Sequence, residues 1–187
     1  MRQAGRRRGA ELEDTILTAA WEELAAVGYV RLTMEGVAAR AHTGKQVLYR
    51  RWRNRAELVI AAIRHRTGSI ADHIPNTGEL RGDVLAVLTW MTQRRQDFGA
   101  DTIHGLMAEL PTMHPEVFTD MQEVMKKILN QAKTRGEIKT ENLPSRLITL
   151  PVDLLRHQLL LTKDPIKETT LEEITDQIFL PLVRARV

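Results

Sequence analysis

The sequence predicts an all-α protein: an amino-terminal three-helix domain joined by a fourth helix to a larger helical domain. Apolar residues recur at intervals of three and four along most of the 187 residues, which is typical of amphipathic helices. Gly, Pro and Asn residues interrupt this pattern where short connections are expected. No segment alternates apolar and polar residues long enough to predict a strand. We therefore expect one domain at residues 1–53 and a second at 54–187.

The composition is that of an ordinary globular protein. Hydrophobic residues make up 43% of the chain and charged residues 27%, so there is enough apolar material for a sizeable core. The chain has no cysteine, which excludes disulfides, thiol catalysis and thiolate metal sites. No apolar stretch follows the first basic residues, and none approaches the length of a membrane span. We expect a cytoplasmic protein with no membrane partner.

The first four helices are predicted from periodicity and from residues that favour helix ends. Leu12, Ile16, Ala20 and Leu24 mark a helix over 11–27 that Gly28 ends. Thr33 is a suitable N-cap for a short helix over 34–41. Residues 42–44 interrupt the pattern, and a third helix follows over 45–52. Asn54 can cap a fourth helix that extends from 55 towards 73.

The remaining chain predicts five more helices. Turn residues at 75–78 precede them. The helices are expected over 84–98, 103–110, 117–135, 147–161 and 171–183, with Pro111 ending the second and Gly136 the third. Pro151 and Pro181 fall inside the last two patterns. Because proline removes a backbone donor, each should kink or locally open its helix.

Positive charge is concentrated near the amino terminus. Residues 1–66 contain 13 Lys and Arg against 7 Asp and Glu, a net charge of +6, whereas 67–187 carry a net charge of −3. Between Arg40 and Arg66, eight basic residues accompany a single acid, Glu57. This charge favours a polyanionic partner. A solvated charged face or an anionic membrane surface would use the same charge, so charge alone leaves the partner open.

Two short helices joined by a few residues form a candidate helix-turn-helix. Leu48 and Trp52 lie four residues apart on one face of the third helix, and we assign them to a core with Val37, Ala38, Ile16 and Ala20. The other faces carry Lys45, Gln46, Tyr49 and Arg50. Gln can pair with adenine, Arg and Lys with guanine, and Tyr with a phosphate oxygen, which predicts a helix that enters the major groove.

The segment LTMEGVAARAHTGKQVLYRRWRNRAELV, residues 32–59, resembles the DNA-binding domain of TetR-type transcriptional regulators. The resemblance covers about residues 11–63. It implies a homodimeric DNA-binding repressor that a small-molecule effector releases from a near-palindromic operator. The DNA contacts it implies are Thr33, Thr43, Gly44, Lys45, Gln46, Val47, Tyr49, Arg50 and Arg55, together with a basic arm over 1–9 that contains Arg6, Arg7 and Arg8.

Three residues of the turn and the third helix depart from the family pattern. His42 stands where the turn usually has Gly, so a positive φ there would cost free energy, although His tolerates it better than most residues. Thr43 replaces a buried aliphatic residue, and Val47 replaces a small polar residue and could contact a thymine methyl group.

The family layout also implies an effector site and a dimer interface in the larger domain. The residues expected to face the effector are Met91, Phe98, Met107, Phe118, Met121, Met125, Leu154, His157 and Gln158. The last two helices should pair across the dimer through exposed apolar residues, namely Leu155, Leu159, Ile174 and Ile178.

Catalysis is not expected from this sequence. Neither serine lies in a G-x-S-x-G motif, and Ala39 and Gln46 break the Walker A pattern around Gly44-Lys45. The histidines lack the H-x-x-x-H spacing of a metal site, so we expect no metal and no cofactor. Two alternatives remain open: a helical module that binds a small molecule or protein partner and has a basic end, and a DNA-binding activator.

Overall fold

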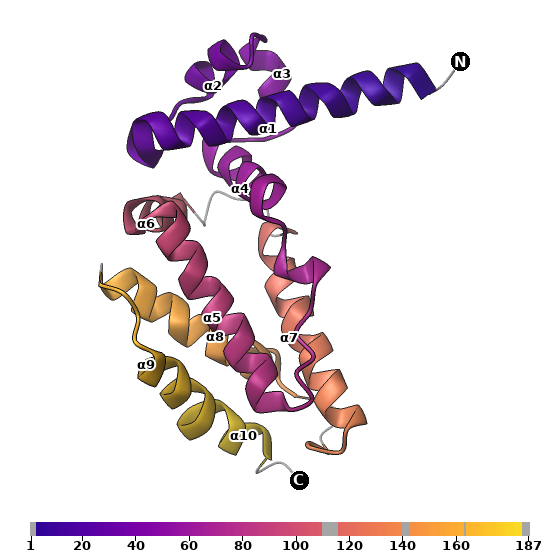
Figure 1. The fold of residues 1–187 in the computed structure, drawn as a ribbon, viewed down its shortest axis with the longest axis vertical. Coiled ribbons are helices and arrows are strands. Elements are labelled where there is room, and N and C mark those ends of the chain that lie inside the picture. Colours follow the sequence, from indigo (N-terminus) through magenta and orange to yellow (C-terminus); the bar gives the residue numbers. More distant parts are fainter. Residues whose placement is uncertain (1–2, 110–115, 140–142, 163, 185–187) are drawn as a thin grey trace. The chain divides into compact units, whose positions relative to one another are not determined.

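A computed structural model describes residues 3–109, 116–139, 143–162 and 164–184, although not the side chains of 3–8 and 116–120. Within these ranges every regular element is a helix, which confirms the predicted all-α class (Figure 1). None of the described helices is long and apolar enough to cross a membrane. The chain divides into two compact units, one of Met1–Ser69 with Asp101–Val117 and one of Ile70–Ala100 with Phe118–Val187.

The first unit begins with four helices: α1 (Gln3–Arg31), α2 (Met34–Arg40), α3 (Lys45–Tyr49) and α4 (Arg55–Thr67). Gly28 interrupts the helical geometry of α1 with φ 72°, where a helix end was predicted. α1 packs against α2 and α4, and α2 packs against α3 (Figure 1). The predicted core is confirmed, because Ile16, Ala20, Val37, Ala38, Leu48 and Trp52 are all buried.

Side-chain caps define where α2 and α4 begin. The hydroxyl oxygen of Thr33 accepts a hydrogen bond from the Gly36 N–H at 3.0 Å. At α4, Asn54 Oδ1 accepts from the Glu57 N–H at 2.9 Å, and Glu57 Oε2 accepts from the Arg53 N–H at 2.9 Å. This reciprocal pair satisfies two backbone donors at the helix start. Both predicted caps are therefore confirmed. Thr33 lies directly before α2, and Asn54 lies after α3 at the start of α4.

Helix α6 (Ala100–Glu109) belongs to the first unit almost in full, although its sequence lies far from α1. Gly105 allows α6 to approach the ring of Tyr29 at the end of α1 so closely that a Cβ atom there would overlap the ring. The units thus divide the chain differently from the expected boundary after residue 53, since α4 and α6 pack with the first three helices.

The second unit contains α5 (Leu80–Phe98), α7 (Glu116–Thr134), α8 (Ser145–Leu161), α9 (Glu168–Glu172) and α10 (Leu180–Arg184), preceded by a short 3₁₀ turn, Ile70–Asp72. A π-helix, Glu173–Phe179, joins α9 to α10, so that the three form one rod in Figure 1. Residues from α5, α7, α8, α9, the π-helix and α10 form the core of this unit. It includes Val84, Leu88, Met125, Ile128, Val152, Leu155 and Phe179.

A buried carboxylate ties the start of α5 to the end of α7. Asp83 is fully buried and accepts hydrogen bonds from the backbone N–H and hydroxyl of Thr77 at 2.6 and 2.8 Å. Its second oxygen accepts from Arg135 at 2.9 Å, and Arg135 also donates to Glu137 at 2.7 Å. Glu137 in turn accepts from the backbone N–H of Leu80 at 2.8 Å. The buried charge is therefore both paired and hydrogen-bonded, as burial of a charge requires.

The two prolines lie in different surroundings. Pro151 is buried inside α8, which continues without a break to Leu161. Pro181 is exposed in the first turn of α10, directly after the π-helix. A local change in helix geometry therefore accompanies Pro181, as the sequence predicted.

Three of the four apolar residues that were expected to be exposed are buried inside the second unit. Leu155 is 0% exposed, Leu159 3% and Ile174 4%, and all three belong to its core. Only Ile178 is half-buried. The expectation of exposure is therefore wrong for these three, because α8 and the π-helix pack against each other and cover them.

Candidate nucleic-acid interface

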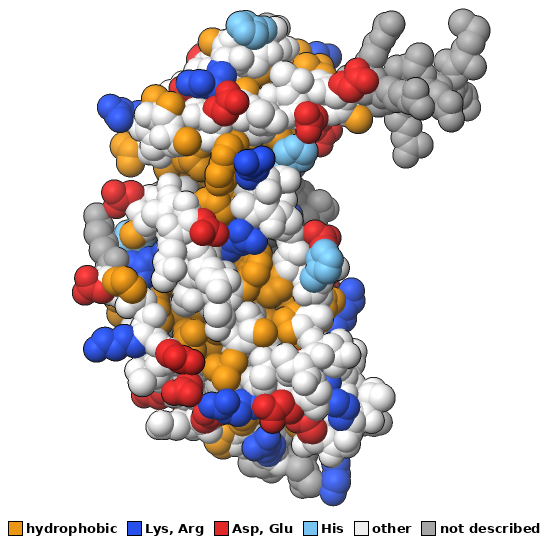
Figure 2. Space-filling model, viewed as in Figure 1, with side chains coloured by type: hydrophobic (Ala, Val, Ile, Leu, Met, Phe, Trp, Pro, Cys, Tyr) orange, Lys and Arg blue, Asp and Glu red, His pale blue; other side chains and the backbone are white. Residues whose placement is uncertain are grey.

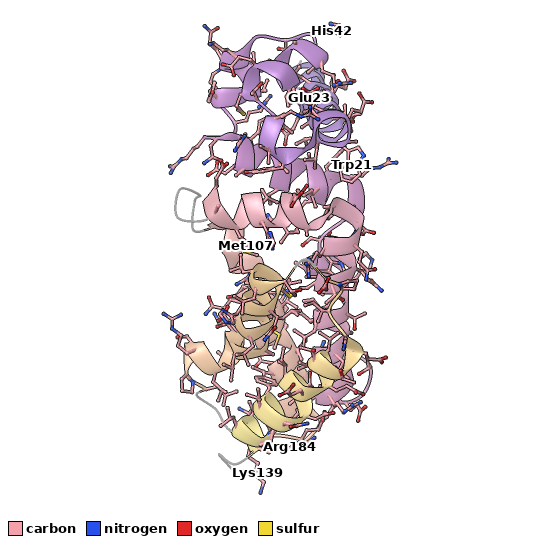
Figure 3. All side chains as sticks on the ribbon, turned by 90° about the vertical axis from the view of Figure 1, so that its left-hand side faces the viewer. Trp21, Glu23, His42, Met107, Lys139 and Arg184 are labelled. Carbon is pink, nitrogen blue, oxygen red and sulfur yellow. The ribbon has the colours of Figure 1, made fainter. Side chains whose placement is uncertain are left out.

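The turn between α2 and α3 has an unusual backbone at His42. Its φ is 50°, and it is the only non-glycine residue with positive φ among the described residues. The backbone N–H groups of His42 and Thr43 donate to the carbonyls of Ala39 and Ala38 at 3.2 and 3.0 Å, which closes α2 and turns the chain. His42 is exposed at this turn, where Figure 3 labels it. His42 therefore adopts the positive φ that glycine favours at this position of the family pattern.

Helix α3 has one buried and one exposed side, as its sequence predicted. Leu48 is fully buried and Trp52, just beyond the helix, is 8% exposed, so these two anchor α3 in the core. Gly44, Lys45, Gln46, Tyr49 and Arg50 are exposed, whereas Thr43 and Val47 are half-buried. An ammonium, an amide, a phenol and a guanidinium thus share one solvent-facing surface, and these are groups that contact base edges and phosphates.

An acid accompanies Lys45 on this surface. Lys45 Nζ donates to Glu35 Oε1 at 3.3 Å, and both side chains are more than half exposed. Hydrogen bonds from its own backbone N–H and from Lys45 lower the pKa of the Glu35 carboxyl. The carboxylate also lies in the first turn of α2, which the helix dipole favours. Lys45 therefore has a weak, solvent-screened partner that phosphate can replace.

Positive charge without an acidic partner follows α3. Arg50, Arg51 and Arg53 are exposed, and their side chains form no ion pair with any residue that the structure describes. Arg40, by contrast, donates to Glu23 at 2.8 Å. The hydroxyl of exposed Thr33 caps α2 and can still donate its own proton. The surface formed by α3 and the residues up to Arg53 thus has the charge to attract a phosphate backbone.

Arg55 lies in a different environment from the one expected. Its guanidinium donates to Glu109 Oε1 on α6 at 2.7 Å and to the carbonyls of Tyr29, Val30 and Leu32 at 3.1 to 3.4 Å. It also stands over the Tyr29 ring, 4.8 Å from the centroid. The hydrogen bond to Glu109 raises the pKa of Arg55. These partners occupy the Arg55 guanidinium in this structure, and its contact with phosphate stays a prediction.

The expected basic arm is continuous with the first helix. Arg6, Arg7 and Arg8 fall within the range of α1, and their side chains lie outside the description. Their contact with DNA stays a prediction.

The comparisons with known proteins agree with this geometry. Residues 16–62 match the model described as "Bacterial regulatory proteins, tetR family", and residues 74–178 match "Tetracyclin repressor-like, C-terminal domain". A Mycobacterium tuberculosis protein named as an uncharacterised HTH-type transcriptional regulator is 34% identical over 161 residues, which cover 82% of this chain and 79% of that protein. The chain belongs to the TetR family. It is accordingly a DNA-binding transcriptional regulator with an amino-terminal helix-turn-helix.

Other TetR-family proteins extend the likeness over almost the whole chain. A DNA-binding transcriptional repressor TetR from Mycobacteroides abscessus is 27% identical over 95% of this chain and 96% of its own length. A solved structure of a TetR family transcription regulator, SCO0332, superposes with a TM-score of 0.65 at 21% identity, covering 90% of this chain and 97% of that one. The superposition on the SCO0332 structure shows that this chain has the same fold.

The residues that the TetR-family layout suggested for an effector lie in different surroundings. Met125 is fully buried in the core, and Met91, Met121 and Leu154 pack partly buried against it. Phe98 is half-buried at the end of α5, and Phe118 lies outside the described side chains. Met107 belongs to the first unit, on α6 (Figure 3). His157 and Gln158 are exposed on α8, so they face solvent in this structure. Their role in effector binding stays a prediction.

Sequence reasoning missed the contacts that hold α6 against α1 and α4. Tyr29 and Glu109 contact Arg55 there, and Gly105 lies against the Tyr29 ring. Burial, helped by the Glu109 charge, raises the pKa of Tyr29 above its ordinary range. These residues come from three separate segments, so no local spacing relates them. The one available signal was Gly105, a glycine inside an otherwise regular helical pattern.

Proposed function

We propose that this protein is a homodimeric, cytoplasmic repressor that binds a near-palindromic operator and is released from it by a small-molecule effector. The observation that supports DNA binding is the exposed side of α3. Lys45, Gln46 and Arg50 would contact base edges, and Tyr49 and Thr33 would bind phosphate oxygens. The relative named as a repressor supports the sign of regulation.

The DNA-binding step is proposed to depend on the rigid placement of α3. Leu48 and Trp52 are buried beneath it, so the helix cannot turn without breaking the core. Arg50, Arg51 and Arg53 would follow the phosphates on one side of the groove. Half to two-thirds of the contacts in such interfaces are to phosphate and sugar, which gives affinity, while the Gln46 amide and the Arg50 guanidinium would give sequence preference.

The homodimer is proposed to form through apolar side chains that the second unit leaves exposed. Leu160 and Leu161 at the end of α8 are 47% and 68% exposed, and Leu182 on α10 is 46% exposed. Two-fold symmetry would then repeat α3 at a spacing of about 34–36 Å or a multiple of it. A near-palindromic operator follows from that symmetry. The sign of regulation can be measured with a reporter under the operator: deletion of a repressor raises its expression.

The DNA-binding proposal can be tested by fluorescence anisotropy with fragments from around the protein's own gene at several salt concentrations. We expect affinity to fall steeply with salt, because bound phosphates release counterions. Tyr49→Phe and Lys45→Ala should each weaken binding to all fragments without changing the melting temperature. Gln46→Ala should instead reduce the preference for the operator over other DNA.

Lys139→Ala is the matched control, since Lys139 is an exposed lysine of the second unit (Figure 3). It should bind like the wild type. If Tyr49→Phe and Lys45→Ala also bind like the wild type, the assignment of α3 is wrong. A folded, dimeric protein that binds none of these fragments would overturn the proposal as a whole.

A further inference from the structure

A buried arginine in the second unit has no acidic partner among the residues that the structure describes. Arg95, in the last turn of α5, is 5% exposed, and its guanidinium donates to the backbone carbonyl of Asp164 at 3.0 Å and to that of Thr162. No carboxylate of the described residues lies within ion-pair distance of it, whereas neighbouring Arg94 pairs with Asp97 at 3.3 Å. Backbone carbonyls and the negative end of α8 reduce the cost of burying this charge, but they do not neutralise it.

Arg95 lines a pocket of about 300 Å³. The other lining residues are Thr92, Gln96, Gly99, Ala100, Pro165 and Ile166. The pocket thus lies between the end of α5, the first residue of α6 and the connection from α8 to α9. All of its residues belong to the second unit, so its shape depends on no contact between the units.

The chemistry of this lining selects a particular class of ligand. A guanidinium has five N–H donors in a planar fork, and the two carbonyls of Asp164 and Thr162 do not use them all. Among the described residues that line the pocket there is no acid and no histidine, so none of these side chains offers a carboxylate or an imidazole to a cation. Pro165, Ile166 and Ala100 supply apolar surface, and the Gln96 amide can donate one more hydrogen bond.

We propose that this pocket, termed the Arg95 pocket, binds a small organic carboxylate with a compact apolar body. The carboxylate pairs with the guanidinium of Arg95, which supplies the charge that the fold leaves unneutralised. The apolar body lies against Pro165 and Ile166. The volume of the Arg95 pocket suits ligands at the small end of those that proteins bind in pockets.

The position of the pocket connects it to regulation. Ala100 lines the pocket and is the first residue of α6, whose remaining residues pack with Tyr29 and Arg55 in the first unit. A ligand that holds Ala100 against Pro165 therefore fixes the start of α6. This regulatory role rests on the proposed ligand-released repressor, whereas carboxylate binding itself does not.

Calorimetric titration of the full-length protein without DNA tests the site. The probes are hexanoate and benzoate, each compared with its neutral amide, hexanamide or benzamide. We expect the carboxylates to bind at least about tenfold more tightly than the amides, because hydrogen bonds to a charged partner are the stronger ones. Equal binding of acid and amide overturns the proposal. So does no binding of either carboxylate at about 10 mM probe, which is tenfold above a Kd of 1 mM.

Two variants locate the binding. Arg95→Gln should remove the preference for carboxylate, and Arg146→Gln, which changes an exposed arginine on α8, should keep it. Because Arg95→Gln also loses bonds to the 162–164 connection, Ala100→Leu serves as a second variant that fills the pocket and leaves Arg95 in place. It should abolish binding of both carboxylates, and undiminished binding to this variant would place the site elsewhere.

The regulatory role is measured separately, by adding the same carboxylates to the protein–DNA complex. Release of DNA by the wild type but not by Ala100→Leu supports it. Carboxylate binding without release rejects the regulatory role and leaves the site standing. Failure of the protein to bind DNA at all rejects the proposed function and leaves the titration result unaffected.

Discussion

At the scale of single residues, the turn before α3 depends on a conformation that L-residues adopt only at a cost. His42 has φ 50°, in the left-handed region. Histidine tolerates this region better than most residues, and a β-branched residue tolerates it poorly. The turn can therefore keep its shape without the glycine that the family usually has there, at a cost of at most about 1–2 kcal/mol.

This cost leads to a prediction for His42. We expect His42→Val to lower the free energy of unfolding by about 1–2 kcal/mol, because a β-branched side chain clashes with the backbone at positive φ. His42→Gly should unfold at the same or higher urea concentration, since it removes the strain. Urea titration followed by circular dichroism measures both. Equal destabilisation by the two variants would show that the imidazole, rather than the backbone conformation, is what the turn requires.

A second residue-scale prediction concerns the ion pair between α5 and the π-helix. Arg81 donates to both oxygens of Asp176 at 2.8 Å, and these hydrogen bonds lower the pKa of the Asp176 carboxyl from its usual 3.8. A carboxyl with a depressed pKa stabilises the fold above its unfolded pKa, and this contribution is lost as the pH falls through the lower, folded pKa. Stability should therefore fall below about pH 4.

Asp176→Asn should remove this part of the pH dependence, so that its unfolding midpoint falls less between about pH 5 and pH 3 than that of the wild type. Glu173→Gln is the matched control, because Glu173 is an exposed acid of the same π-helix. Urea unfolding at several pH values makes the comparison. The ion pair has no part in acid stability if the two variants follow the same curve as the wild type.

At the scale of elements, α6 is held against α1 through a position that has room for hydrogen only. A Cβ atom at Gly105 would overlap the ring of Tyr29. We expect Gly105→Ala to cost about 1–3 kcal/mol through overpacking. Gly9→Ala is the control: Gly9 lies in α1 with open space around its Cα, so alanine there should be neutral or slightly stabilising.

Thermal and urea unfolding measure the two glycine variants, and operator affinity is measured beside them. Because Arg55 and Glu109 join α6 to the start of α4, Gly105→Ala should also change DNA affinity, whereas Gly9→Ala should not. An alanine at 105 that leaves both stability and affinity unchanged would mean that α6 does not rest on Tyr29 in solution.

The elements also show what sequence could and could not predict. The two sides of α3 were predicted correctly because one helical period separates Leu48 from Trp52 and the neighbouring caps lie close in sequence. Leu155, Leu159 and Ile174 were misjudged because periodicity reveals an apolar stripe but not which element covers it. Arg55 and Arg95 were beyond prediction, since their partners come from segments more than 20 residues away.

At the scale of the whole molecule, charge is distributed unequally along the chain. Residues 1–66 carry a net charge of +6 and the rest a net charge of −3. On the face shown in Figure 2, acidic and basic side chains are interspersed over the second unit, with hydrophobic side chains visible between them. This distribution suits a protein whose amino-terminal part meets DNA and whose remainder meets a second copy of the chain.

The proposed dimer gives a prediction at this scale. Leu161→Glu should convert the dimer to a monomer in sedimentation velocity experiments, because it puts a charge on the exposed apolar surface of α8. Val30→Glu changes an equally exposed apolar residue on α1 and should leave the dimer intact. A dimer that tolerates Leu161→Glu must form through another surface. A wild-type monomer at all concentrations would reject the homodimer.

The π-helix at Glu173–Phe179 has a consequence for the alignment of related sequences. Its i→i+5 hydrogen bonds form a wider turn, which holds one residue more than a regular helical turn. Because the wider turn accommodates that residue, the residues beyond it keep the direction that a regular helix would give them. Val183 is buried now, and it should stay in the core when one residue is removed from the π-helix. Relatives without the extra residue should accordingly align with a single-position gap here and carry their apolar residues one place earlier.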